Sequence, residues 1–320
     1  MPDLGPTAPS RLPVTAFEPA SASPIRPGEP AIQAFHRALA EGYYWLGVNA
    51  PRARQGDPQG VHHLRTTTRR IRTALSLFAG LTEPAWADPL AEEFRWLAET
   101  LGAVRDIDVM TDRLMALADS IDHASVVALE PLFRELQGRH NAASDTLRDA
   151  LMSDRFQSLA ATLASAADQM PIADAGWVPC WSALPPLVAA SWKKLRRDAR
   201  ALAPDTPDEA FHEVRKRAKR ARYAAEAVRD ALPGSARRDA SRFARRVRAV
   251  QDILGAHQDA VIAAEQLRQS AAARPDDGPF NFAAGRVMEA ENRVASASRA
   301  RFFEVWAALD RRKLTRWLHP

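Results

Sequence analysis

The sequence has 320 residues, of which 46% are hydrophobic, so it is long enough to bury one large core or two ordinary ones. Glycine is scarce at 14 residues, and alanine and leucine outnumber the β-branched residues, a balance that favours helices over strands. The single cysteine, Cys180, excludes a disulfide within the chain, and no apolar run approaches the roughly 20 residues of a membrane span. We therefore expect an all-α, cytoplasmic protein that does not enter a membrane.

The basic residues are mostly of one kind. There are 44 lysines and arginines against 39 acidic residues, for a formal net charge of +5, and only five of the 44 are lysines. Arginine is the planar cation that binds phosphate through two parallel hydrogen bonds. Genomic codon bias also enriches arginine together with alanine, so the count leaves both explanations open. The positions of the arginines along the helices are more informative.

Breaks rich in proline and glycine divide the chain into predicted helices. Residues 1–30 contain eight prolines and no apolar signal-peptide segment, which predicts a disordered tail. The predicted helices of the first half are 31–50, 59–79, 86–119 and 124–168, the last broken near residue 152. After a linker at 170–178, those of the second half are 180–202, 207–231, 235–271 and 280–310. Residues 313–320 are predicted to form a C-terminal tail.

The two halves also match each other in sequence. Three pairs of segments recur in the same order at offsets of 150, 153 and 146 residues: 61–72 with 211–222, 101–106 with 254–259, and 155–156 with 301–302. Such an internal duplication predicts two similar helical units. We therefore expect one domain over 31–312 built from two four-helix bundles, 31–169 and 177–312, related by a pseudo-two-fold axis.

Each half carries a basic stripe on one helix. At about 100° per residue, four side chains of the first half lie on one helix face, and so do their counterparts in the second. The two stripes are His62, Arg65, Arg69 and Arg72, and His212, Arg215, Lys219 and Arg222. A lone basic stripe is usually a solvated face neutralised by acids one turn away. Between residues 215 and 222, however, six basic residues occur without an acid, so a counter-ion is expected.

Further basic residues lie beside the stripes or on other helices. These secondary candidates are Arg70, Lys193, Arg196, Arg197, Arg200, Arg220, Arg238, Arg242 and Arg245. His62 and His212 begin the two stripes, and they are either buried structural histidines or donors that gain a proton when phosphate oxygens approach.

The acidic candidates are fewer. Asp106 and Asp108 form a pair that is conceivable as a metal site, but Asp108 aligns with Val261 and no further ligand lies close in the sequence. We therefore predict no metal and expect Asp106 and Asp259 to orient arginines of a neighbouring helix. Gly102 and Gly255 are expected to permit close approach of two helices.

These motifs resemble the CHAD family, named for conserved histidines in an α-helical domain. The resemblance covers about residues 31–312, and its motif residues are Val61, His62, Leu64, Arg65, Arg69, Arg70 and Arg72, followed by Leu101, Gly102, Arg105, Asp106, Asp108 and Val109. It implies two four-helix bundles around a basic central cavity that binds inorganic polyphosphate, often at polyphosphate granules. By that resemblance the two stripes are the ligand residues.

Two departures from the pattern weaken the second-half motif. Lys219 stands where an arginine is expected, which keeps the charge but loses the two-pronged geometry. Gln258 stands at the position of Arg105 in the first half.

The favoured function is non-enzymatic polyphosphate binding without a cofactor, and two alternatives stay open. A phosphoryl-transfer enzyme or hydrolase needs a metal or a positioned base beside the cations. A nucleic-acid-binding protein needs aromatic residues interleaved with the basic stripes for base stacking. Neither feature is visible in the sequence, which is also silent on the oligomeric state.

Overall fold

The computed structural model describes residues 24–319, and this part of the chain is helical with no strand. The first half contains α1 (Ile32–Arg54), α2 (Pro58–Leu77), α3 (Pro84–Ile121), α4 (His123–Ala128), α5 (Glu130–Met152) and α6 (Asp154–Gln169). The second half contains α7 (Cys180–Arg200), α8 (Asp208–Val228), α9 (Gly234–Ala272), α10 (Gly278–Leu309) and α11 (Arg312–Thr315). The all-α prediction is confirmed.

Local chemistry explains where the helices end. Ser153 separates α5 from α6, near the predicted break, and its hydroxyl accepts a hydrogen bond from the Phe156 amide at 3.2 Å as the N-cap of α6. The predicted end of the first helix at residue 50 is wrong, because α1 runs through Pro51 to Arg54. A proline in the last turn removes only one helical hydrogen bond. The helix stops where Gly56 adopts a φ of 78°, the left-handed conformation that favours glycine.

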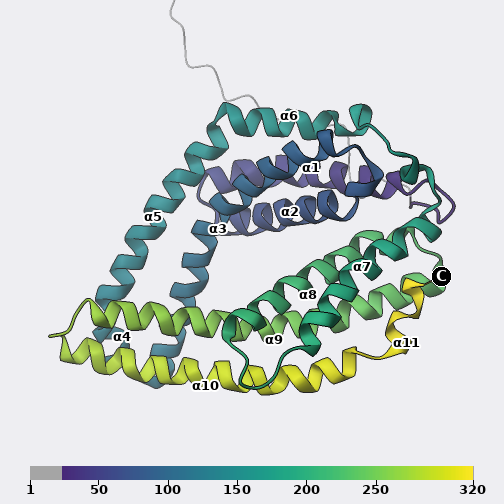
Figure 1. Ribbon diagram of the computed structural model, residues 1–320. Coiled ribbons are helices and arrows are strands. Elements are labelled where there is room, and N and C mark those ends of the chain that lie inside the picture. Colours follow the sequence, from purple (N-terminus) through teal and green to yellow (C-terminus); the bar gives the residue numbers. More distant parts are fainter. Residues whose placement is uncertain (1–23, 320) are drawn as a thin grey trace, which may run out of the picture.

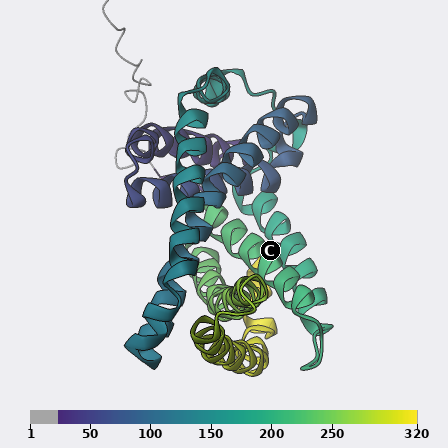
Figure 2. The same cartoon turned by 90° about the vertical axis from the view of Figure 1, so that its left-hand side faces the viewer.

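The helices form two layers joined at one end (Figure 1). α1, α2, α6 and the first part of α3 make the upper layer, and α7, α8, α9 and α10 make the lower one. The long helices α3 and α5 descend from the upper layer and reach α9 and α10. Figure 2 shows α9 and α10 nearly end-on. α2 of the upper layer packs against α8 of the lower layer, and this contact is where the two predicted basic stripes meet.

The buried residues form two hydrophobic clusters. The larger cluster spans both layers and contains Phe35, Leu64 and Phe94 as well as Phe211 and Phe243. The smaller cluster lies at the joined end, where the far parts of α3 and α5 pack against α9 and α10; its members include Leu114, Leu132, Leu136, Leu267 and Phe280. The two halves of the chain therefore share their apolar core instead of enclosing separate ones.

Helix lengths follow the same order in the two halves. α1, α2 and α3 have 23, 20 and 38 residues, and α7, α8 and α9 have 21, 21 and 39. The halves differ at their ends, where α5 and α6 are separate helices and α10 is one continuous helix. The arrangement as two bundles about a pseudo-two-fold axis stays a prediction.

Both predicted tails extend into the ordered domain. Residues 1–23 of the predicted N-terminal tail lie outside the described residues, but Glu29 and Pro27 accept hydrogen bonds from the amides of Cys180 at 2.9 Å and Trp181 at 3.0 Å. At the other end, Trp317 and Leu318 are buried, with the Trp317 ring 5.9 Å from that of Phe243. Folded structure thus begins before residue 31 and continues beyond residue 312, because these short segments dock on distant helices that local composition does not reveal.

No helix within the described residues is long and apolar enough to cross a membrane.

Candidate anion-binding site

The basic stripes lie beside the apolar faces that hold α2 and α8 in place. Leu64 and Ile71 of α2, and Val214, Ala218 and Ala221 of α8, are fully buried. Asp57 caps the start of α2 by accepting a hydrogen bond from the Gln59 amide at 2.9 Å. With the apolar stripe of each helix turned into the core, its basic stripe turns toward the contact between the two layers.

Five cations come together there, and we call them the central cluster: Arg65 and Arg69 of α2, and Arg215, Lys219 and Arg222 of α8. Burial, followed by the charges of Arg215, Arg69 and Arg65, lowers the pKa of Lys219 from its ordinary 10.5 to about 8. Burial also lowers the pKa of Arg69. Tyr223 opposes this shift, and the charges of Arg222 and Arg65 reinforce it. The structure thus brings residues about 150 positions apart in the sequence into one electrostatic site.

The central cluster has more donors than acceptors. The Nε atoms of Arg69, Arg215 and Arg222 are buried without a hydrogen-bond partner among the described residues. Arg222 Nε lies 3.4 Å from Glu226 Oε1, close enough for an ion pair but not aligned as a hydrogen bond. An unsatisfied buried donor costs about 1–3 kcal/mol, and more when the group is charged. Anionic oxygens would satisfy all three.

The predicted orienting acids lie next to this cluster. Arg65 Nη1 donates to Asp106 Oδ1 at 2.8 Å, and at the equivalent position of the second half Arg215 Nη2 lies 3.9 Å from Asp259 Oδ1. Asp106 is 72% exposed and Asp259 is 38% exposed, so both carboxylates are open to solvent. Each of them pairs with one arginine of the central cluster, and within the described residues no ion pair reaches Arg69 or Lys219.

Gly102 and Gly255 do not serve close helix approach, and that expectation is wrong. A Cβ at Gly255 would meet only the Arg215 side chain at 3.6 Å, and one at Gly102 only the Asp106 carboxylate at 3.8 Å, which are ordinary contacts. Close approaches between helices occur instead at Gly42 and Gly60, among others, where a Cβ would come 2.5 Å from Ile71 and 2.6 Å from Arg52. Sequence reasoning missed these two glycines because their neighbours come from other turns and other helices.

The two predicted histidines lie at the rim of the site. The pKa of His62 is lowered, chiefly by partial burial and next by the charge of Arg105. The pKa of His212 is lowered by burial and then by the charges of Lys216 and Arg215. Gln258, which stands at the position of Arg105 in the first half, opposes the shift at His212, whereas Arg105 reinforces the shift at His62. Both imidazoles start from below their ordinary pKa of 6.5, so they are neutral at pH 7 in the free protein.

Arg72 is exposed at the edge of the contact. Burial lowers the pKa of Arg72, and the charges of Arg95 and Arg220 add to this shift. The charge of Glu99 opposes it. Arg72 therefore faces α3 and the secondary candidate Arg220 more than the central cluster.

Most secondary candidates on α7 and α9 are placed elsewhere. Arg196 and Arg200 both donate to Asp310 at 2.6 Å and thereby tie α7 to the end of α10. Arg197 pairs with Asp198, and Arg242 pairs with Asp239. Lys193, Arg238 and Arg245 are exposed, and within the described chain none of these residues makes an ion pair or hydrogen bond with the central cluster. Helical spacing showed that they share faces, but it could not show which face meets the other half.

Tyr223 is a site residue that the sequence reasoning missed. Its ring lies 5.1 Å from the Arg69 guanidinium and 4.3 Å from that of Arg222, close enough for cation–π attraction to both. The only available signal was an aromatic residue directly after the second stripe.

The acidic residues of the described chain do not form a metal site. No group of three or more histidine, cysteine, aspartate or glutamate side chains there is arranged to hold a metal ion. Asp108 instead lies 3.0 Å from His140 Nε2 and 3.6 Å from Arg105 Nη1.

The fold and site together define an α-helical protein with a half-buried cationic cluster between its two layers. The chain belongs to the CHAD domain family, whose model matches residues 37–268. It is 30% identical over 322 residues to the uncharacterized protein Rv2226 of Mycobacterium tuberculosis strain H37Rv, and equally to MT2285 of strain CDC 1551. The match covers 96% of this chain and 57% of each relative, so the chain spans little more than half the length of these proteins.

Two solved structures share the fold. PptA from Streptomyces chartreusis has a TM-score of 0.71 at 23% identity, covering 87% of this chain and 99% of PptA. The crystal structure of the CHAD domain from the plant Ricinus communis has a TM-score of 0.69 at 24% identity, covering 95% of this chain and 98% of that domain.

Proposed function

We propose that this protein binds inorganic polyphosphate at the central cluster and does not turn it over. The observation that carries the proposal is the excess of half-buried cations with three unsatisfied Nε donors. The first and last residues of each basic stripe are ten positions apart, roughly 15 Å of helix at about 1.5 Å per residue. An extended anion with one charge per unit matches such a row better than a compact one does, and the family resemblance implies the same ligand.

The arrangement of acids supports binding over catalysis. Phosphoryl transfer requires a metal or a base positioned beside the phosphate. Here the carboxylates beside the cluster, Asp106, Glu226 and Asp259, each pair with an arginine. Incubation with polyphosphate, with and without added magnesium, should release no phosphate above the rate without protein.

The aromatic residue at the cluster argues against nucleic acid. Base stacking needs an exposed ring face. Tyr223 is only 6% exposed, and its ring already packs against Arg69 and Arg222. We therefore expect polyphosphate to outcompete single-stranded DNA of equal charge, and preference for the DNA would reverse the proposal.

The site would function in the cytoplasm, where the protein would collect on polyphosphate granules. The support for this location is the family resemblance. Imaging of a fluorescent fusion should show foci that coincide with granules and disperse in cells that make no polyphosphate.

Salt dependence tests how many phosphates are engaged. Borrowing the single-strand coefficient of about −0.7 per contact, the five cations of the central cluster predict a slope of log K against log salt near −3.5, and all eight stripe residues predict about −5.6. Titration with polyphosphate of one defined length across a salt series measures this slope. A value shallower than about −2 would mean that the cluster is not the binding site.

The pH dependence should follow Lys219. In the free protein its pKa is about 8, and a bound oxyanion raises it because the opposite charge favours the ammonium form. Affinity is therefore greatest below pH 8 and falls as pH rises through 8 toward the pKa of the complex. Calorimetry at about pH 9 in two buffers should detect proton uptake on binding, and Lys219→Arg should abolish it because arginine stays protonated. Unchanged uptake in that variant would assign the proton to another group.

The histidines should contribute a separate uptake at lower pH. Because the pKa values of His62 and His212 are lowered in the free protein and would rise beside phosphate, affinity should increase as pH falls below 6.5. Proton uptake at about pH 6 should fall in the double variant His62→Gln, His212→Gln. Unchanged uptake would make both histidines structural.

A further inference from the structure

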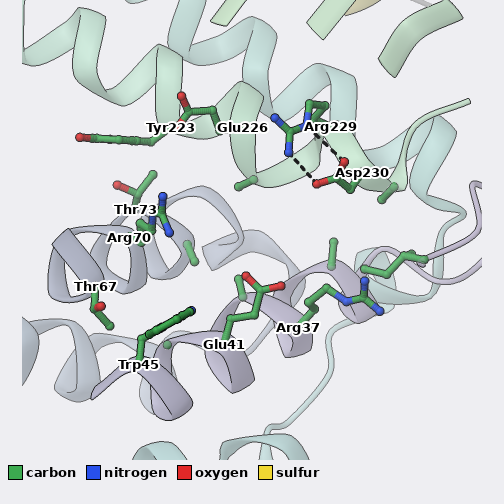
Figure 3. A pocket seen from close by; sticks show the side chains of 17 residues that line it. Arg37, Glu41, Trp45, Thr67, Arg70, Thr73, Tyr223, Glu226, Arg229 and Asp230 are labelled. Carbon is green, nitrogen blue, oxygen red and sulfur yellow. Dashed lines mark hydrogen bonds and ion pairs between the residues drawn. The ribbon is translucent and has the colours of Figure 1, made fainter. Parts of the chain in front are cut away.

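A second site lies beside the central cluster, in a cavity of about 380 Å³ lined by α1, α2, α8 and the turn that follows α8 (Figure 3). This volume is within the roughly 300–1,000 Å³ typical of small-molecule sites. None of the eight stripe residues lines it, and of the secondary candidates only Arg70 does. Tyr223 forms part of its wall, so the cavity adjoins the cluster but is separate from it.

Most charged side chains around the cavity are already paired. Asp230 accepts from Arg229 at 2.9 Å and pairs with Arg237 at 3.0 Å, and Glu226 pairs with Arg222. Glu41 and Arg70 are different, because within the described chain neither makes a hydrogen bond or an ion pair, with each other or with another residue. Figure 3 shows the Glu41 carboxylate directed into the cavity, with Arg70 across from it on α2.

No cation of the described chain lies within ion-pair distance of the Glu41 carboxylate. It is half-buried, and burial raises its pKa, while the charges of Arg37 and Arg70 only partly oppose that shift. An ammonium group in the cavity would supply the missing partner at short range.

The unpaired Arg70 guanidinium determines which group the other end of a ligand must carry. One guanidinium matches one carboxylate through two parallel hydrogen bonds. A phosphate dianion or a polyanion would need several free cations, and it would be repelled by Glu41. The open charges therefore select a ligand with one charge of each sign.

Apolar side chains also line the cavity. Trp45 is 41% exposed and lines the cavity together with Ala38, Ala227 and Ala231. A flat or aliphatic group would cover the indole and bury apolar area from water.

We propose that this cavity binds an apolar α-amino acid, with its ammonium group on Glu41, its carboxylate on Arg70 and its side chain against Trp45. The site is independent of polyphosphate binding at the central cluster.

The test uses three ligands with the same ring and different charges. Calorimetry on the full chain compares L-phenylalanine with phenethylamine, which lacks the carboxylate, and with 3-phenylpropionate, which lacks the amine. L-phenylalanine should bind at least about tenfold more tightly than either, because each missing charge leaves one charged group unpaired. Equal binding of all three would reduce the site to an apolar pocket, and no binding by any of them would overturn the proposal.

Variants then locate the site and separate it from the proposed function. Glu41→Gln and Trp45→Leu should each weaken L-phenylalanine binding by about tenfold or more and leave polyphosphate affinity unchanged. Glu83→Gln, at an exposed glutamate outside the cavity, is the matched control and should bind like the native chain. Melting curves confirm that each variant folds, and native-like affinity in both cavity variants would refute the assignment.

Discussion

Polyphosphate binding should weaken by about tenfold to a hundredfold when Arg69, Arg215 or Arg222 is replaced by alanine, since a charge-assisted hydrogen bond contributes roughly 1.5–3 kcal/mol. The same changes should leave the melting temperature of the free protein equal or higher. Each of these side chains is a half-buried cation among like charges, so its removal relieves repulsion and one unsatisfied donor. Loss of affinity with retained or increased stability is the signature of a ligand site.

Arg134→Ala and Arg311→Ala are the matched controls, because both arginines are exposed and outside the duplicated motifs. They should change the affinity little. Binding titrations at one salt concentration, paired with melting curves of each free variant, provide both readouts. If the control variants lose as much affinity as the cluster variants, the protein is a diffuse polycation without a specific site. If the cluster variants unfold, the arginines are structural.

The largest loss of stability should come from Arg113→Ala, far from the central cluster. Glu291 of α10 is fully buried, and Arg113 of α3 binds both of its carboxylate oxygens, through Nε to Oε1 at 2.6 Å and through Nη2 to Oε2. Removing the arginine leaves an uncompensated buried charge, which costs about 3–5 kcal/mol. Chemical denaturation should therefore show a much lower midpoint for this variant than for Arg134→Ala.

A double variant separates the cost of a broken pair from the value of the pair. Arg113→Met combined with Glu291→Met replaces both charges with apolar groups and should recover most of the lost stability, because buried ion pairs often contribute little over well-packed apolar residues. An Arg113→Ala variant as stable as the native chain would show that Glu291 is neutralised in another way. Because this pair joins α3 of the first half to α10 of the second, it also measures how the halves are held together.

Helix positions and the stripes follow from local pattern. Pro, Gly and apolar periodicity placed most helices within a few residues, and the break near residue 152 coincides with the Ser153 cap. The placement of Arg65 with Arg69, and of Arg215 with Lys219, on one helix face depends only on the 3.6 residues per turn of an α-helix. These features are readable from sequence because the groups that determine them lie within one or two turns of each other.

The tertiary structure alone decided which faces meet. It places Lys219 among three arginines and so lowers its pKa, puts Tyr223 between Arg69 and Arg222, and assigns Arg196 to Asp310 instead of to the site. It also docks Trp317 onto the core and leaves Glu41 opposite Arg70 across a cavity. Burial, pKa and pairing depend on neighbours that come largely from other helices, far away in the sequence. Helical periodicity describes each face but carries no information about the surface packed against it.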